Sequence, residues 1–253
     1  MFRPIRLFFL LLVLAFVSLS LWTERARIAS WENPLWVVVY PIRTAGSGRV
    51  DRYVSRLREA DFRPIERYLD SQAQRYGLPL RHPVEIKLAA PIDDAPPTQP
   101  ARGDWLATIW FTLRLRYWAW RHDSFDGPTD VQIFVTYDDP DLRPRLAHSL
   151  GLEKGRIGLV NAYGVNGYAG RNHVVITHEL LHTVGATDKY DLATGQPLYP
   201  DGYADPGREP RYPQARAEIM GGQIPLGPDE STMPDSLRET VIGPRTAREI
   251  GWT

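Results

Sequence analysis

The stretch from His178 to Asp188 limits the possible structures of this chain more than any other, because its spacing fits a helix that ends sharply. It reads His-Glu-Leu-Leu-His-Thr-Val-Gly-Ala-Thr-Asp. On a helix, residues four positions apart lie on one face, so His178 and His182 can bind one metal ion together. Gly185 is typical of the left-handed turn that ends a helix. It allows the backbone to reverse and to bring Asp188 back toward the two imidazoles.

The residue types in this stretch indicate a zinc site. A catalytic zinc ion takes three protein ligands and keeps its fourth position open for water. The helix supplies His178 and His182, and we expect Asp188 to be the third ligand. Thiolate ligands are excluded because the chain has no cysteine. Three other carboxylates remain as rivals for the third position: Asp191, Glu209 and Glu218.

Glu179 follows the first histidine and is rotated away from the metal-binding face, yet it can reach a water on the same metal. A carboxylate there can take a proton from an activated water, which makes Glu179 the expected catalytic base. A single histidine is more often a core residue or a helix cap than a ligand. Two of the six histidines at metal spacing, with a glutamate between them, favour a site instead.

From His178 to Asp188 the sequence resembles the metzincin clan of zinc metallopeptidases, whose motif is H-E-x-x-H-x-x-G-x-x-[HD]. The aspartate is the minority form in that clan. A second clan feature is a methionine-containing turn under the metal, and Met220, within the run Glu-Ile-Met-Gly-Gly, resembles it. No tyrosine follows Met220 closely, as one does in some members, and Tyr190 is the candidate for a tyrosine that stabilises the transition state.

The resemblance covers about 45 residues, from His178 to Gly222, and the rest of the chain is not similar to any particular metzincin family. It implies an α+β domain with a small mixed sheet and an active-site helix. It also implies a bound Zn²⁺ and hydrolysis of peptide bonds in a peptide or protein substrate, with Glu179 as general base and then general acid.

Two other functions stay open at this point. One is a catalytically inactive, zinc-stabilised binding module at the membrane, against which the intact Glu179 argues. The other is a zinc hydrolase that acts on non-peptide amides. Nucleic acid is not expected as a partner, because 30 basic and 30 acidic residues leave no net charge.

The N-terminus predicts attachment to a membrane. An apolar run extends from Leu7 to Trp22 and is interrupted only by two serines. It is slightly shorter than the roughly 20 residues of a spanning helix, but flanking Arg6 and Trp22 can extend it to the interfaces. We expect residues 1–29 to be an uncleaved single-pass anchor and residues 30–253 to be an extracytoplasmic peptidase domain. If the segment is instead a cleaved signal peptide, the protein is secreted.

Hydrophobic periodicity predicts the remaining elements. Strands are expected at 35–42, 84–89, 131–137 and 156–162. Helices are expected within 50–76, with a new start at Pro64, and at 104–120, 172–184 and 245–250, while 187–213 reads as a long irregular segment. Asn172 is the expected cap of the motif helix.

Two of these elements allow a functional and a structural interpretation. The strand at 131–137 is either the edge strand that binds extended substrate or an interior strand. The aromatic helix at 104–120 carries Trp105, Ile109, Leu113 and Tyr117 four residues apart. We expect this stripe to pack against the sheet; a membrane-surface or substrate platform is the alternative.

Overall fold

A five-stranded mixed sheet forms the centre of the computed structural model, which describes residues 30–100, 105–146, 149–152 and 156–253. Its strand order is β2-β1-β3-β5-β4. Four neighbouring strands are parallel, and β4 is an antiparallel edge strand on β5. The strands are β1 Leu35–Arg43, β2 Val84–Leu88, β3 Val131–Asp138, β4 Leu150–Leu152 and β5 Ile157–Tyr163.

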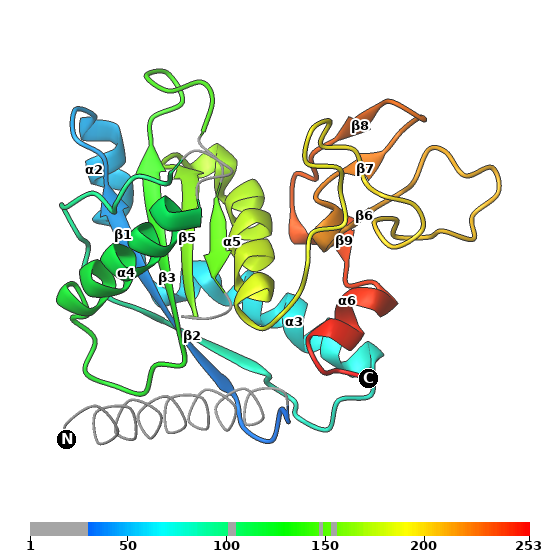
Figure 1. The fold of residues 1–253 in the computed structure, drawn as a ribbon, viewed down its shortest axis with the longest axis horizontal. Helices are drawn as coiled ribbons and strands as arrows, with labels where there is room; N and C mark the ends of the chain where they lie inside the picture. Colours follow the sequence, from blue (N-terminus) through cyan, green and yellow to red (C-terminus); the bar gives the residue numbers. More distant parts are fainter. Residues whose placement is uncertain (1–29, 101–104, 147–148, 153–155) are drawn as a thin grey trace, which may run out of the picture.

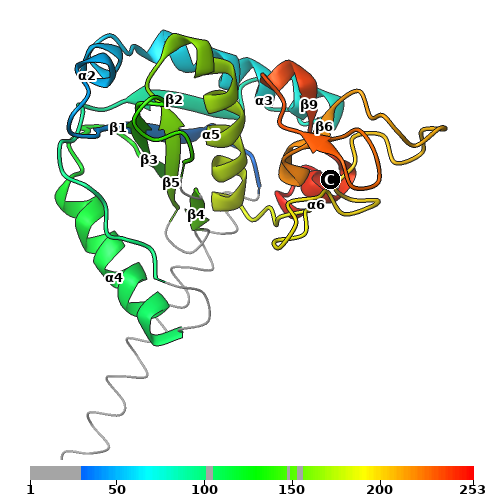
Figure 2. The ribbon, with the colours of Figure 1, turned by 90° about the horizontal axis from the view of Figure 1, so that it is seen from above.

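Helices cover both faces of this sheet (Figures 1 and 2). On one face lie α3 and α5, and α5 carries the part of the His178–Asp188 motif that ends at Thr183; α4 lies on the opposite face. The α-helices of the described part are α2 Gly48–Val54, α3 Arg63–Arg75, α4 Trp105–Arg121, α5 Ala169–Thr183 and α6 Pro244–Glu249. Single-turn 3-10 helices are η1 Glu59–Phe62, η3 Asn166–Tyr168, η4 Ile219–Gly221 and η5 Leu237–Glu239.

The strands are apolar on both sides because both of their faces are covered. In β1, Val37 and Val39 join the core under α3 and α5, whereas Val38 and Tyr40 join the core under α4. Tyr40 stacks on Phe134 of β3, with 4.8 Å between the ring centroids. The alternation of strand side chains therefore divides one sheet between two separate cores.

The C-terminal part of the chain packs beside α5 (Figure 1). It contains two small two-stranded sheets, β6 Ala217–Glu218 with β9 Thr240–Val241 and β7 Ile224–Pro225 with β8 Ser231–Thr232. No helix interrupts residues 187–213, as predicted. Ile219, Met220 and Trp252 are buried in the same core as α3 and α5, so this part belongs to the main body.

Most of the predicted helices and strands are present, but the predicted fold class is wrong. The mixed sheet and the motif helix are found, but parallel strands with helices on both faces make the fold α/β rather than α+β. The strand at 131–137 is β3, which lies between β1 and β5 and is therefore not an edge strand. The predicted anchor, residues 1–29, lies outside the described residues. Among the described residues, no helix combines the length and apolar content needed to cross a bilayer.

Two predictions about side chains are wrong. Asn172 lies within α5 rather than at its cap, and its amide bonds to the backbone nitrogen and oxygen of Tyr163 at 3.2 and 2.9 Å. The stripe Trp105, Ile109, Leu113 and Tyr117 of α4 is exposed, not packed on the sheet. The opposite side of the helix faces the core: Phe111, Leu115, Trp118 and Ala119.

Candidate metal centre

Helix α5 brings His178 and His182 together on one face, as their spacing predicts. Their two Nε2 atoms lie 3.1 Å apart. The Oδ1 atom of Asp188 lies 3.2 Å from Nε2 of His178 and 3.0 Å from Nε2 of His182. Among the described residues, this is the one group of three side chains placed to hold a metal ion. The third member is therefore Asp188 rather than one of its rivals.

The second nitrogen of each imidazole is held by a backbone carbonyl. Nδ1 of His178 lies 2.9 Å from the Ile219 oxygen, and Nδ1 of His182 lies 2.8 Å from the Ala186 oxygen. A carbonyl oxygen only accepts hydrogen bonds, so each Nδ1 carries the proton. In the neutral imidazoles both Nε2 atoms then carry lone pairs that point at Asp188, and only a protonated imidazole can donate a hydrogen bond to its carboxylate. This is the usual arrangement around metal-binding histidines.

The chain reverses directly after α5 to deliver Asp188. Gly185 has a φ of +108°, which a residue with a side chain adopts only with strain. Beyond the turn, the Lys189 amide donates to the Met220 carbonyl at 2.9 Å. The Thr187 amide and the Lys189 ammonium both donate to Oε2 of Glu249, at 2.9 and 2.7 Å. Bonds on both sides of Asp188 thus fix its position.

The pKa shifts of these side chains favour a cation between the two imidazole Nε2 atoms and the carboxylate oxygen of Asp188. Burial lowers the pKa of His178, but its hydrogen bond with Asp188 and the charge of Glu179 outweigh burial and raise that pKa. Burial raises the pKa of Asp188, but its hydrogen bonds with His178 and His182 outweigh it and lower that pKa. Both shifts have the same origin: a positive charge at this point is stabilised.

The donor set fits zinc. Ligand atoms about 2.0–2.1 Å from a tetrahedral zinc ion are about 3.3–3.4 Å from one another. The three donor atoms are 3.0–3.2 Å apart, which is close to that spacing. Two imidazoles with one carboxylate are a common catalytic zinc set, and softer thiolate-binding metals have no ligand here. A fourth position remains for water, since the described residues contribute three donors.

We call His178, His182 and Asp188 the metal group. The side chain of Glu179 is buried beside it, and Glu179 is 5% exposed. Burial raises the pKa of its carboxyl, and the charges of His178 and His182 act in the opposite direction. One carboxylate interaction is with the backbone amide of Gly151. The Oε2 atom has no hydrogen-bond partner among the described residues. A buried acceptor without a partner is uncommon and is available to take a proton.

Gly151 is a site residue that the sequence prediction missed. It lies in the edge strand β4, directly opposite Gly158 of β5. A Cβ atom on Gly151 would lie 2.5 Å from Cβ of His182 and 2.6 Å from the Glu179 carbonyl oxygen. Only glycine therefore lets β4 approach the helix this closely. The Leu-Gly-Leu run is too short for a periodic signal, and an isolated glycine between apolar residues was the one available indication.

The turn that contains Met220 contacts His178 through a backbone carbonyl. Met220 is fully buried in η4, and the preceding Ile219 supplies the carbonyl that holds His178. Glu218 shapes this turn from inside the core. Its Oε2 accepts the amides of Met220 and Gly221 at 2.7 and 2.9 Å. Its Oε1 accepts from the Gly243 amide and the Thr246 hydroxyl, at 2.9 and 2.8 Å.

The rival carboxylates have other positions. Both carboxylate oxygens of Glu218 accept two hydrogen bonds each, so they are not placed to bind a metal ion. Asp191 accepts from the amides of Ala193 and Thr194 and so stabilises a local turn. Glu209 is exposed in the irregular segment. The ring centroid of Tyr190 lies 6.3 Å from that of His178, so its role as a transition-state donor stays a prediction.

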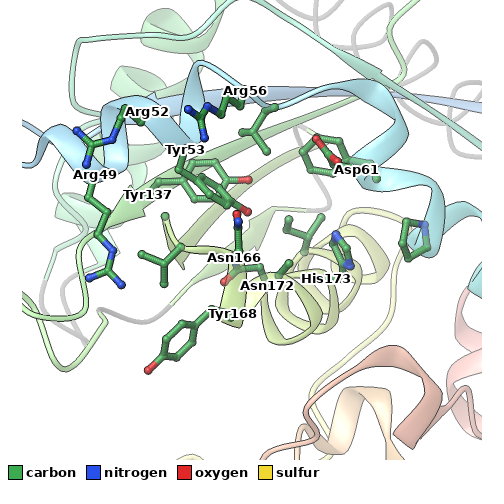
Figure 3. A pocket seen from close by; sticks show the side chains of 18 of the residues that line it. Arg49, Arg52, Tyr53, Arg56, Asp61, Tyr137, Asn166, Tyr168, Asn172 and His173 are labelled. Carbon is green, nitrogen blue, oxygen red and sulfur yellow. The ribbon is translucent and has the colours of Figure 1, made fainter.

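A cavity of about 910 Å³ lies away from the metal group. It lies between α2, η1, the end of β3 and the first turns of α5. Figure 3 shows Arg49, Arg52 and Arg56 along one rim and His173 of α5 across from them. Cavity size and metal chemistry thus point to different places. We favour the metal group, because three donors converge there and no comparable set lines the cavity.

A scan of the chain against models of known protein families matches none of them, and a search of curated proteins finds no match either.

Proposed function

We propose that this chain is a membrane-anchored zinc metalloendopeptidase with a metzincin-like catalytic domain. One observation carries the proposal. Two imidazole Nε2 atoms and one carboxylate oxygen converge within 3.2 Å, with both Nδ1 protons bound to carbonyls and a buried glutamate beside them. A structural zinc site has four protein ligands and no bound water, so it does not need a glutamate as general base.

His178, His182 and Asp188 would hold the ion. When bound, zinc lowers the pKa of water toward about 7 and polarises a carbonyl group. Glu179 then takes the proton of the attacking water on its free Oε2 atom and passes it to the leaving amine. Burial, which raises the pKa of Glu179, suits this exchange because it makes the carboxylate a stronger base.

The edge of β4 is the best candidate for binding extended substrate. It replaces β3, which is an interior strand. The Gly151 backbone bonds to the Glu179 carboxylate, and no side chain would fit between Gly151 and His182, so a peptide paired with the outer side of β4 would pass the metal group. Pairing through backbone hydrogen bonds demands little of the substrate sequence.

Membrane attachment rests on the apolar run from Leu7 to Trp22. We assign residues 1–29 as a single-pass anchor and place the catalytic domain on the extracytoplasmic side. Cleavage of this segment would instead release a secreted enzyme.

The test compares the full chain, purified in detergent and loaded with zinc, with Glu179→Gln. We expect the parent to bind one zinc ion and to cleave an unstructured protein. The Glu179→Gln variant should bind zinc equally and cleave about 10²- to 10⁴-fold more slowly, as expected for loss of a general base. Glu209→Gln is the matched control, because Glu209 is exposed and remote from the metal group in the chain; it should behave as the parent.

The other results separate the alternatives. Stoichiometric zinc without cleavage by the parent would overturn the peptidase proposal and favour an inactive binding module. Hydrolysis of small non-peptide amides without cleavage of protein would favour the amide hydrolase. Failure to bind zinc would overturn the metal site itself.

A further inference from the structure

Helix α4 exposes an unusually large apolar surface. Seven large apolar side chains on this helix are between 51% and 72% exposed: Trp105, Leu106, Ile109, Trp110, Leu113, Tyr117 and Trp120. Isolated exposed apolar residues are ordinary, but a contiguous group on one helix indicates a surface that meets another apolar phase.

The exposed group forms one continuous stripe. At 3.6 residues per turn, the seven residues span an arc of about 140° around the helix axis. The four residues buried against the sheet span a separate arc of about 100°. The helix is therefore apolar on two sides, and the described part of the chain covers only one of them. Figure 2 shows that the helix lies outside the sheet, on the side away from α5.

The charges on α4 are all positive. Arg114, Arg116 and Arg121 are exposed, and the helix contains no aspartate or glutamate, in a chain whose charges otherwise balance. None of the three arginines forms an ion pair within the described part of the chain. Arg114 and Arg121 follow one border of the exposed stripe, and Arg116 lies within the stripe, near its other border. Tryptophans with flanking arginines are the composition of helices that lie in a membrane interface.

The proposed anchor would keep the domain that carries this helix near a bilayer. The apolar run ends at Trp22 and β1 begins at Leu35, a separation of 35 − 22 = 13 residues. Thirteen residues reach at most about 45 Å when fully extended. A domain tethered at this distance presents its surface to the bilayer at high local concentration.

We propose that α4 is a second, interfacial membrane contact, which lies in the plane of an anionic bilayer with its tryptophan-rich stripe at the boundary between headgroups and acyl chains. The arginines in and beside the stripe contact lipid phosphates. The occupant of the apolar surface is thus lipid. This inference rests on the membrane anchoring in the proposed function and is independent of its zinc chemistry.

The absence of cysteine allows a direct test, because one introduced cysteine can be labelled alone. The full chain is reconstituted into vesicles of phosphatidylcholine with phosphatidylglycerol, and Leu113→Cys carries an environment-sensitive fluorophore. Leu192→Cys is the matched control, since Leu192 is also exposed, at 57% compared with 54%, but lies in the irregular segment. Flotation of the protein with the vesicles reports the anchor, and quenching by nitroxide lipids reports the depth of the label.

We expect the label at position 113 to be blue-shifted and quenched several-fold more strongly by lipid nitroxides than the label at 192. Arg114→Gln, Arg116→Gln and Arg121→Gln together should reduce this difference. Protein that floats while both labels respond only to an aqueous quencher would overturn the inference and leave the anchor intact. A label at 113 shielded from both quenchers would also overturn it, because residues 1–29 or a second copy would then cover α4. Protein that does not float would overturn anchor and inference together.

Discussion

Helices α5 and α4 cover opposite faces of the same sheet and use their surfaces in opposite ways. Helix α5 buries polar groups: Glu179 is 5% exposed, and His178 and His182 are largely enclosed. Helix α4 exposes apolar ones, with Trp120 at 72% and Trp105 at 68%. Each arrangement costs free energy in water unless a partner compensates for it.

The comparison shows where partners are to be expected. The buried polar groups of α5 are compensated by hydrogen bonds, except at Oε2 of Glu179 and between the two imidazole Nε2 atoms and Oδ1 of Asp188. The exposed apolar stripe of α4 has no compensation within the described residues. We interpret the first gap as room for a metal ion and a water, and the second as a surface for lipid.

The positions of Glu179 and His182 on α5 depend on the close approach of β4. Of the changes considered, Gly151→Ala should disturb these two residues most. The new Cβ would meet His182 and the backbone of Glu179 at 2.5 and 2.6 Å, so both must move. We expect kcat/KM for an unstructured protein substrate to fall about 10²- to 10⁴-fold, the range for a displaced general base. Gly167→Ala is the control, because a Cβ there meets no atom within 4 Å. Equal activity of the two variants would show that β4 does not constrain the site.

The polar network behind the metal group should be the next most sensitive. Glu249 binds the buried Lys189 and the backbone of Thr187, so Glu249→Gln leaves an ammonium without its counter-ion. We expect the free energy of unfolding to fall by about 3–5 kcal/mol, measured by urea denaturation. Arg248→Gln is a neighbouring control on the same helix; a comparable loss there would contradict a specific role of Glu249.

The pKa of Glu249 predicts that the protein loses stability at acidic pH. Burial raises the pKa of Glu249, but the hydrogen bonds from Lys189, Thr187 and Arg245 outweigh burial and lower it from its ordinary 4.5 to about 2. A folded-state pKa below the unfolded value stabilises the fold above pH 4.5, and this contribution is lost as the pH falls toward about 2. The difference in stability between parent and Glu249→Gln should shrink across this range. A constant difference would contradict the assignment.

The smallest effect is expected on the exposed side of α4. Leu115 and Leu113 lie two residues apart, but Leu115 is fully buried and Leu113 is 54% exposed. Leu115→Ala should lower the free energy of unfolding by about 2–5 kcal/mol, and Leu113→Ala by no more than about 0.5 kcal/mol. Thermal or urea unfolding in detergent measures both. A large loss for Leu113→Ala would mean that protein covers the stripe.

The sequence predicted best what helix periodicity and glycine geometry determine. His178, Glu179 and His182 lie as their spacing requires, and Gly185 turns the chain so that Asp188 reaches the imidazoles. The sequence also predicts β1, β2, β3 and β5, because buried parallel strands are continuously apolar.

What the sequence left open or predicted wrongly concerns contacts between separate parts of the chain. Strand order placed β3 inside the sheet, and no local pattern encodes strand order. Strand β4 is three residues long, too short for a periodic signal. Both sides of α4 are apolar, so its sequence could not show which one meets the sheet. Asn172 resembled a helix cap, but its amide serves the backbone of Tyr163 instead.

X-ray absorption spectroscopy of the zinc-loaded full chain tests the central claim most directly. We predict one zinc ion with two imidazole nitrogens and carboxylate or water oxygens at about 2.0–2.2 Å. His182→Ala should remove one imidazole from the spectrum. Asp188→Asn should change the oxygen ligands, and Asp191→Asn should leave the spectrum as in the parent. A chain that binds no stoichiometric zinc, or a zinc ion without two imidazoles, would contradict the account.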